Sequence, residues 1–439
     1  MQKCRLAAGG SVSDNELIVL AIALLMVIHL FIGLPLFVVL GLGSLAMIAA
    51  VGVYSISIVG EVPFSAMDNW ALLAMPLFIL TGDIISSGRI ARQLVRLGDA
   101  LVGWMTGGLG MATIWGCFFI SGTSGSNSAD TAAIGRIMIP TMVEKGYSRS
   151  YAAALAASGG CLGIIVPPSL IFIIYGVVTS TSVGDLFLGG VLPGMLMAAF
   201  MCFANYLVCR FSGWGAHDRK PFAAREVLRA AWDARYGLGA PALILGGIYS
   251  GLFTPTEAAA VAVAYCFFVE MFITRGITLR DVPRLLVRSG CITGMIAPVI
   301  AFSILFGEVL AILRLPERIA AYLLSLPSGY ITAVLMILVI LLVVGCFLET
   351  IAAIIILMPI LLPIATSLQF HPVHFGVFVM CSLTIGFITP PVGINLFAAS
   401  AVSGVPYLAI AWRAWPLFVA LIFATLAVGF VPWFSIWFK

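Results

Sequence analysis

Long apolar stretches separated by short polar connections make up nearly the whole chain. A helix needs roughly 17 to 25 predominantly apolar residues to span a bilayer. Apolar runs long enough to span occupy 17–52, 70–86, 184–209, 237–273, 290–312, 319–343 and 405–436. Two further apolar regions are interrupted by polar residues. We predict about ten to twelve membrane-spanning helices, with additional re-entrant pieces. The first run lacks a convincing cleavage site, so we interpret it as a retained span.

The two interrupted regions repeat one pattern. Each has a carboxylate and a threonine inside a polar-broken apolar segment, followed by a Pro-Pro step in another apolar segment. Asp130-Thr131 and Glu349-Thr350 lie 219 residues apart, and Pro167-Pro168 and Pro390-Pro391 lie 223 residues apart. Matching interruptions in the two halves of a chain are the best sequence indication of a transporter's binding site near the membrane midplane. The pattern therefore indicates a duplicated unit.

Composition agrees with this pattern. The chain is 62% hydrophobic and 9% charged, whereas soluble globular chains carry about 25% charged residues. We predict an all-α polytopic membrane protein. Nine cysteines show no C-x-x-C spacing and four histidines fit no zinc motif, so neither a disulfide framework nor a zinc site is indicated. A net charge of +4, without a basic face, argues against nucleic-acid binding.

Basic residues predict which connections face the cytoplasm. They cluster at 89–96, 136–149, 210–235 and 275–288. The first interrupted region, 109–142, lies between two of these clusters and breaks at 121–128, which favours a hairpin that enters and leaves on the same side. The second hairpin, 330–368 with its break at 345–350, lacks a basic excess in its flanks. We therefore expect it to open from the opposite side, which would make the repeats inverted.

The repeats and the polar connections divide the chain into five expected parts. The expected parts are N-terminal scaffold spans and an amphipathic arm (1–104), a first transport-domain repeat (105–183), scaffold spans with a second arm (184–318), a second transport-domain repeat (319–404) and a C-terminal span (405–439). Polar segments at 88–105, 210–236 and 278–290 are predicted to form amphipathic helices on the inner membrane surface.

The Pro-Pro steps indicate where chemistry occurs. Proline lacks an N–H and clashes with the preceding turn, so nearby carbonyls are released from helical pairing and can ligate a hard cation with hydroxyls from the facing hairpin tip. The first predicted sodium site comprises Ser121, Ser124, Gly163, Val166 and Pro167. The second comprises Gly345, Gly386, Thr389 and Val392. The alternative is that these small residues only allow helices to approach closely.

Intramembrane carboxylates are functional candidates because they are costly there. Asp130 and Glu349 each follow a hairpin tip, where capping or indirect support of a cation is favoured over direct ligation. The side chains that could bind substrate are Asn127, Thr131, Thr350, Asn395 and Arg136. Arg136 has a simpler alternative, snorkelling to the interface. Glu257, which follows Thr254-Pro-Thr, is interpreted as part of a helix cap.

Together these motifs resemble the large membrane (M) subunit, of the DctM type, of the tripartite ATP-independent periplasmic (TRAP) transporters. The resemblance covers almost the whole chain after about residue 17. Its motifs are Met75-Pro-Leu-Phe78, Ser121-Gly through Ala133-Ile-Gly135, Ile139-Pro140, Gly146-Tyr147, Gly163 through Pro167-Pro168-Ser169, Pro193-Gly194, Thr256-Glu257-Ala-Ala, Met358-Pro-Ile-Leu-Leu-Pro363 and Gly386 through Pro390-Pro391-Val-Gly393. Glu349 departs from the aspartate that the resemblance leads us to expect at the second tip.

The resemblance implies an elevator-type secondary transporter in the bacterial inner membrane. It implies uptake of an organic acid (a C4-dicarboxylate, sialic acid or sugar acid) coupled to sodium at two sites. Its expected partners are a separate small four-helix membrane subunit and a periplasmic substrate-binding protein. Two alternatives remain. One is a proton-coupled elevator of related fold, and the other is an intramembrane hydrolase that uses Ser124 or Asp130.

Overall fold

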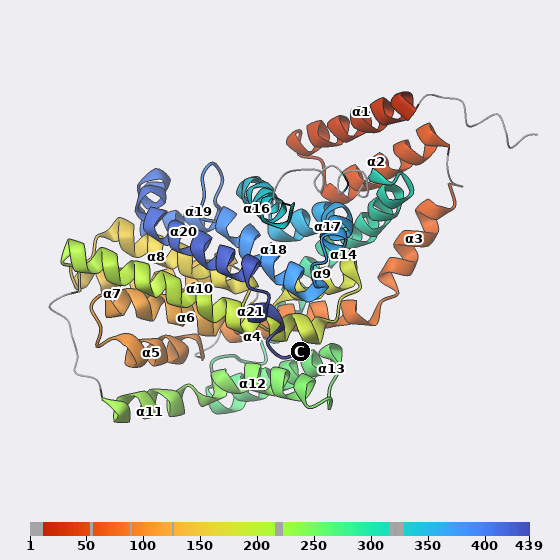
Figure 1. The fold of residues 1–439 in the computed structure, drawn as a ribbon. Helices are drawn as coiled ribbons and strands as arrows, with labels where there is room; N and C mark the ends of the chain where they lie inside the picture. Colours follow the sequence, from red (N-terminus) through yellow and green to blue (C-terminus); the bar gives the residue numbers. More distant parts are fainter. Residues whose placement is uncertain are drawn as a thin grey trace, which may run out of the picture.

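The computed structural model of the chain describes residues 12–52, 56–87, 90–124, 127–215, 223–315, 321 and 329–439. Every regular element within these residues is a helix (Figure 1). The first half contains α1 (Val12–Phe31), α2 (Leu36–Val51), α3 (Ile58–Met67), α4 (Ala74–Ser87), α5 (Ile90–Val102), α6 (Gly108–Ser124), α7 (Asn127–Glu144), α8 (Arg149–Gly160), α9 (Leu170–Thr179) and α10 (Val183–Ser212).

The second half is also helical. It contains α11 (Ala224–Asp233), α12 (Arg235–Tyr249), α13 (Pro255–Phe268), α14 (Val282–Ile312), α16 (Gly329–Phe347), α17 (Thr350–Ser367), α18 (Pro372–Gly386), α19 (Ile394–Ser403), α20 (Tyr407–Phe430) and α21 (Trp433–Ile436). Short 3₁₀ turns, η1 (Trp70–Leu73) and η2 (Cys161–Ile164), and a π-turn, η3 (Val269–Ile273), join some of them.

Six helices in the described residues are long and apolar enough to cross a membrane. They are Val183–Ser212, Pro255–Ile273, Val282–Ile312, Tyr330–Phe347, Thr350–Ser367 and Tyr407–Phe430. Other apolar helices are shorter because glycine and proline interrupt the runs. The run 17–52, for example, is divided at Gly33, which has a φ of 91°, and Pro35, which precedes α2. The chain is therefore a multi-pass membrane protein whose apolar runs are subdivided more than their length indicated.

Both duplicated units contain a helix pair and an interrupted helix. The first pair is α6 and α7, and the second is α16 and α17, which meet at Leu348 and Glu349. The chain is non-helical between η2 and α9, where Pro167-Pro168 lies, and between α18 and α19, where Pro390-Pro391 lies. Both Pro-Pro peptide bonds are cis.

The interrupted helices of the two units meet at equivalent residues. Cys161 and Thr384 are 223 positions apart, the spacing of the Pro-Pro steps. The Thr384 hydroxyl donates to the Cys161 carbonyl at 2.6 Å, and the Cys161 thiol donates to the Thr384 carbonyl at 3.2 Å. The duplicated units therefore pack around a shared centre.

The helices that follow each interrupted helix also pack into this centre. α10 contacts α20 extensively, and both contact α18. In Figure 1 α10 lies beside α6 and α20 lies beside α8, although α20 is near the end of the sequence. Packing therefore continues across the expected boundaries at 183/184 and 404/405.

The predicted amphipathic segments have different outcomes. Helices α5 and α11 lie side by side at one edge of the molecule (Figure 1), and no residue of α11 is buried. The segment 278–290 instead runs into α14, whose 31 residues extend to Ile312, because the apolar run after residue 290 continues the helix. A turn precedes α14, in which the hydroxyl and N–H of Thr278 donate to Asp281 and hold the pKa of that carboxyl below its ordinary value.

Candidate functional site

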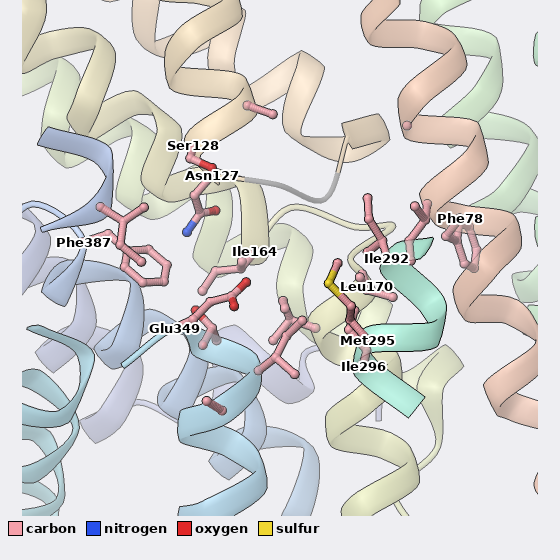
Figure 2. A pocket seen from close by; sticks show the side chains of 18 of the residues that line it. Phe78, Asn127, Ser128, Ile164, Leu170, Ile292, Met295, Ile296, Glu349 and Phe387 are labelled. Atoms are coloured by element: carbon pink, nitrogen blue, oxygen red, sulfur yellow. The ribbon is translucent and has the colours of Figure 1, made fainter. Parts of the chain in front are cut away.

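A cavity of about 770 Å³ lies where the two duplicated units face α4 and α14. The start of α7, the start of α17 and both interrupted helices contribute to its wall. Figure 2 shows Asn127 and Glu349 directed into this space from different elements, with Ile292 and Met295 of α14 across from them. The polar and charged lining residues are Asp83, Asn127, Ser128, Arg288, Glu349, Thr350 and Asn395. The tertiary structure therefore brings both repeats to one site.

The first hairpin tip forms a compact oxygen cluster. The Ser121 hydroxyl donates to Asp130 Oδ2 at 3.0 Å, and both residues are buried. Neither side-chain polar atom of buried Asn127 has a hydrogen-bond partner. A Cβ added to Gly163 would lie 2.6 Å from Asn127 Oδ1 and 3.0 Å from Asp130 Oδ2. Gly163 thus allows the backbone of the first interrupted helix to approach the tip, and these oxygens are suited to a hard cation.

Of the other residues in the first predicted cation site, Val166 and Pro167 follow η2, and the side chain of Ser124 is not among those that the structure describes. Both Val166 and Pro167 are buried. Ser169 donates to the Ile164 carbonyl at 2.8 Å and receives the Ile171 N–H, so it caps α9 across the interruption. Ser124 ends α6, and its side chain lies outside the described part of the chain.

The second hairpin tip is built by close backbone packing. A Cβ on Gly386 would lie 2.2 Å from the Gly345 carbonyl carbon, and a Cβ on Gly345 would lie 2.7 Å from the Leu383 oxygen. The Gly386 carbonyl accepts the Thr389 N–H at 3.1 Å, and the Thr389 hydroxyl donates to the Ile385 carbonyl at 2.8 Å. This is the close approach that the packing alternative requires, although the Thr389 hydroxyl oxygen keeps acceptor capacity.

The carboxylates at the two tips differ in their surroundings. Asp130 lies in the first turn of α7, buried against Ser121. Glu349 occupies the N-cap position of α17 but makes no side-chain capping hydrogen bond, and it lines the cavity. The capping role predicted for Glu349 is therefore absent from this structure. The side chain instead extends into the cavity, as Figure 2 shows.

Three predicted substrate-binding residues line the cavity, and two do not. Asn127, Thr350 and Asn395 are lining residues, and the Thr350 hydroxyl and Asn395 Oδ1 are buried without a partner. The Asn395 amide donates to the Ala157 carbonyl at 3.0 Å, which ties the second interrupted helix to α8. Thr131 and Arg136 do not line the cavity.

Thr131 and Arg136 both follow the first tip along α7. The Thr131 hydroxyl donates to the Asn127 carbonyl at 2.9 Å and is buried. Arg136 is exposed on α7 and is not a lining residue. Its placement at the membrane interface stays a prediction.

Asp83 and Arg288 are lining residues that the sequence patterns did not single out. In the sequence Arg288 belongs to the basic cluster 275–288, and Asp83 lies inside the apolar run 70–86. An aspartate in such a run is itself a functional indication. That signal could have identified this wall of the cavity.

The cap predicted at Glu257 is present. The Thr254 hydroxyl accepts the Glu257 N–H at 3.3 Å, and the Glu257 carboxylate accepts the Thr254 N–H at 2.8 Å. This reciprocal pair is a capping box at the start of α13. Glu257 therefore has a structural role.

Two solved structures have a related fold. The YdaH transporter of Alcanivorax borkumensis matches with a TM-score of 0.59 and 15% identity, covering 86% of this chain and 87% of that chain. The MtrF protein of Neisseria gonorrhoeae matches with a TM-score of 0.60 and 14% identity, covering 87% and 84%. At these identities, the likeness concerns the fold alone.

Similarity in sequence is much closer to TRAP permeases. The C4-dicarboxylate large permease protein DctM of Pseudomonas aeruginosa is 40% identical over 84% of this chain and 86% of its own. The sialic acid large permease protein SiaM of Vibrio cholerae is 34% identical over 93% of this chain and 95% of its own. The isethionate permease protein DctMQ of Oleidesulfovibrio alaskensis is 37% identical over 92% of this chain, which spans 64% of that relative.

Residues 22–434 match the family described as the tripartite ATP-independent periplasmic transporter, DctM component. The match covers both hairpins, both interrupted helices and the cavity between them. The chain therefore belongs to the DctM component family of the TRAP transporters.

Proposed function

We propose that this chain catalyses sodium-coupled uptake of an organic acid by moving its two duplicated units past a fixed wall. The observation that carries the proposal is the convergence of both hairpin tips and both interrupted helices on one cavity. Non-helical backbone at membrane depth is tolerated where it is buried in protein or lines a cavity. Two such interruptions at one cavity are typical of secondary transporters.

The substrate class follows from the polar groups of the cavity and from the relatives. Asn127 and Asn395 bring amide groups to the cavity, and α7 and α17 begin at its wall. Amide donors and helix N-termini stabilise carboxylates. Relatives are named for C4-dicarboxylate, sialic acid and 2,3-diketo-L-gulonate transport. An organic anion of this kind is therefore the proposed cargo.

The first sodium is proposed at the oxygen cluster of the first tip. Asp130, Ser121 and the unpartnered Oδ1 of Asn127 surround Gly163, and carbonyls of 163–167 complete the donor set. Because Asp130 belongs to this cluster, the site includes a carboxylate in addition to hydroxyl, amide and carbonyl oxygens. The carboxylate strengthens cation binding and offsets the charge of the ion.

The second sodium is proposed beside the second tip, from the Thr389 hydroxyl oxygen and the carbonyls of Gly345, Gly386 and Val392. The half-buried Thr389 and Val392 lie at the second interruption. Hydroxyl and carbonyl oxygens are ligands that hard cations accept. The donor set is less complete than at the first tip, where a carboxylate and a free amide oxygen are present.

Uptake by this route requires other proteins. We place the chain in the bacterial inner membrane with a separate small four-helix membrane subunit and a periplasmic substrate-binding protein. The family description names a tripartite system, and the name DctMQ of one relative, of which this chain spans 64%, indicates a fused small subunit there. The binding protein delivers the anion, and the elevator movement of the duplicated units carries it across.

Proton coupling is the second candidate because carboxylates lie at both tips. Glu349 lines the cavity and Asp130 is buried. Either group could carry a proton in place of a cation. The two mechanisms differ in which gradient drives uptake.

The experiment reconstitutes the chain in proteoliposomes with the small subunit and binding protein encoded in neighbouring reading frames. Radiolabelled succinate, N-acetylneuraminate and 2,3-diketogulonate serve as probes. We expect an inward sodium gradient to drive accumulation of one probe in unmodified form and a pH gradient alone to drive none. Thr389→Val should lower the apparent sodium affinity by about tenfold, as expected for losing a hydrogen-bonding group to a charge.

Thr366→Val is the matched control. Its hydroxyl also donates four residues back, to the Leu362 carbonyl at 2.9 Å, but it is exposed on α17. Uptake that persists without sodium in the wild type and in Thr389→Val would overturn the proposal. Accumulation driven by a pH gradient would favour proton coupling, and hydrolysed probe would favour the enzyme alternative.

A further inference from the structure

An ion pair forms part of the wall opposite the hairpin tips. Arg288 Nε of α14 lies 3.4 Å from Asp83 Oδ1 of α4. The Ser289 hydroxyl donates to the other carboxylate oxygen of Asp83 at 3.3 Å. Asp83 is thus held from two sides, while both members of the pair line the cavity.

The two partners differ in exposure. The Arg288 side chain is 60% exposed, whereas that of Asp83 is 11% exposed. An ion pair with one well-exposed partner contributes little to stability. A brace between α4 and α14 is therefore an incomplete account of an arginine that also lines the cavity.

Arg288 brings a positive charge to the cavity wall. Among the lining residues of the described chain, Asp83 and Glu349 are acidic and Arg288 is the basic one. A guanidinium carries five N–H donors in a rigid fork that matches a carboxylate. Nε approaches Asp83, so the geometry of the fork allows a second carboxylate to be bound while the pair persists.

The position of Arg288 in the sequence indicates on which side of the membrane it acts. Arg288 belongs to the basic cluster at 275–288 that the positive-inside rule assigns to the cytoplasm. Asp83 precedes the basic connection 89–96 by a few residues. By this rule both helices reach the pair near their cytoplasmic ends, whereas Asn127, Glu349 and Asn395 belong to the duplicated units.

We propose that Arg288, held by Asp83, is an anion-receiving residue at the cytoplasmic mouth of the cavity, where it binds the substrate carboxylate as it leaves the hairpin tips. The inference rests on the proposed function. In this inference, α4 and α14 select for carboxylates at the cytoplasmic face, where the substrate is released. This selection adds to the binding groups that the duplicated units provide.

The test compares the two faces of the membrane. The probe is whichever of succinate, N-acetylneuraminate and 2,3-diketogulonate the wild type transports in the sodium-gradient experiment. Right-side-out vesicles report KM from the periplasmic face, and inverted vesicles report KM from the cytoplasmic face. We expect Arg288→Gln to raise the cytoplasmic KM about tenfold or more, as for the loss of a charge-assisted hydrogen bond, and the periplasmic KM less than about twofold.

Two further variants separate anion binding from bracing. Arg284→Gln, an exposed arginine of α14 that does not line the cavity, should leave both KM values unchanged. The exchange Asp83→Arg with Arg288→Asp keeps a pair of opposite charges between the helices, but it moves the cation to α4. We expect this double variant to remain defective from the cytoplasmic face.

Recovery of wild-type KM in the charge exchange would identify the pair as a structural brace and overturn the inference. Equal KM increases on both faces, or an unchanged KM in Arg288→Gln, would also overturn it. If the wild type transports none of the three probes, the proposed function fails first, and that outcome is distinct from failure of Arg288 alone. Thermal unfolding midpoints close to that of the wild type establish that each variant is folded.

Discussion

Gly163 decides how closely the first interrupted helix approaches the first hairpin tip. The space beside its Cα is occupied by the amide oxygen of Asn127 and the carboxylate of Asp130. A methyl group there would have to displace one or both, because real Cβ atoms do not lie 2.6 Å from another heavy atom. Glycine at this position therefore leaves the space that the oxygen atoms of Asn127 and Asp130 occupy.

We predict that Gly163→Ala lowers the apparent sodium affinity by at least about tenfold. It should destabilise the protein by about 1–3 kcal/mol, as typical overpacking does. Sodium-dependent uptake and the thermal unfolding midpoint are the measurements. Gly290→Ala on α14, where an added Cβ has nothing within 4 Å, is the control and should leave both unchanged or raise stability slightly. Wild-type sodium affinity in Gly163→Ala would remove Gly163 from the cation site.

At the scale of elements, the second duplicated unit relies on backbone contact. Helix α16 packs on α18 through Gly345 and Gly386, with no room for a Cβ on Gly386. Small residues allow this approach in membranes, where van der Waals packing replaces the hydrophobic driving force between helices. The first unit reaches its partner by polar side chains and the second by glycines. Equivalent positions in the repeats thus serve different contacts.

We predict that Gly386→Ala forces α16 and α18 apart and lowers the unfolding free energy by about 1–3 kcal/mol. The added Cβ would lie 2.2 Å from a backbone carbon of Gly345, and backbone cannot rotate away as a flexible side chain can. Monodispersity in detergent and the unfolding midpoint are the measurements. Gly294→Ala on α14, another glycine in open space, is the control. An unfolding midpoint equal to that of the wild type would show that α16 and α18 can accommodate an added methyl group without loss of stability.

For the whole molecule, inversion of the repeats remains a prediction from charge. The first hairpin ends at Glu144, next to the basic cluster at 136–149, and the second ends at Ser367, before a segment without basic excess. The positive-inside rule then assigns the two ends to opposite sides. The exchange of hydrogen bonds between Cys161 and Thr384 is compatible with a two-fold axis between the units.

We expect single cysteines at the two ends to be labelled from opposite faces. In a background with the nine native cysteines replaced, Glu144→Cys should react with a membrane-impermeant maleimide only in inverted vesicles. Ser367→Cys should react only in right-side-out vesicles. Both native residues are exposed, so access is limited by the membrane alone. Labelling of both from one face would mean that the repeats are parallel.

The sequence predicted much of the fold because its signals are local. The chain leaves helical structure at both Pro-Pro steps, Pro167-Pro168 and Pro390-Pro391, where proline removes an N–H and clashes with the preceding turn, whereas single prolines such as Pro140 and Pro359 lie inside helices; that the two helix pairs are re-entrant stays a prediction. The prediction of a separate amphipathic helix at 278–290 was wrong. Residues from Val282 onward and the apolar run beyond them form one continuous helix, α14, which extends to Ile312. Periodicity describes a face of a helix and does not say where that helix stops.

The sequence by itself determined a duplicated, helical membrane protein, because repeat spacing, apolar length and basic clusters are all read along the chain. Only the tertiary structure decided which residues share the cavity. It brought Glu349 into the cavity without a capping bond, left Arg136 exposed, and added Asp83 and Arg288 from elements outside the repeats. The physical reason is that a cavity wall is formed by contacts between helices distant in sequence, and no local pattern specifies which faces will meet.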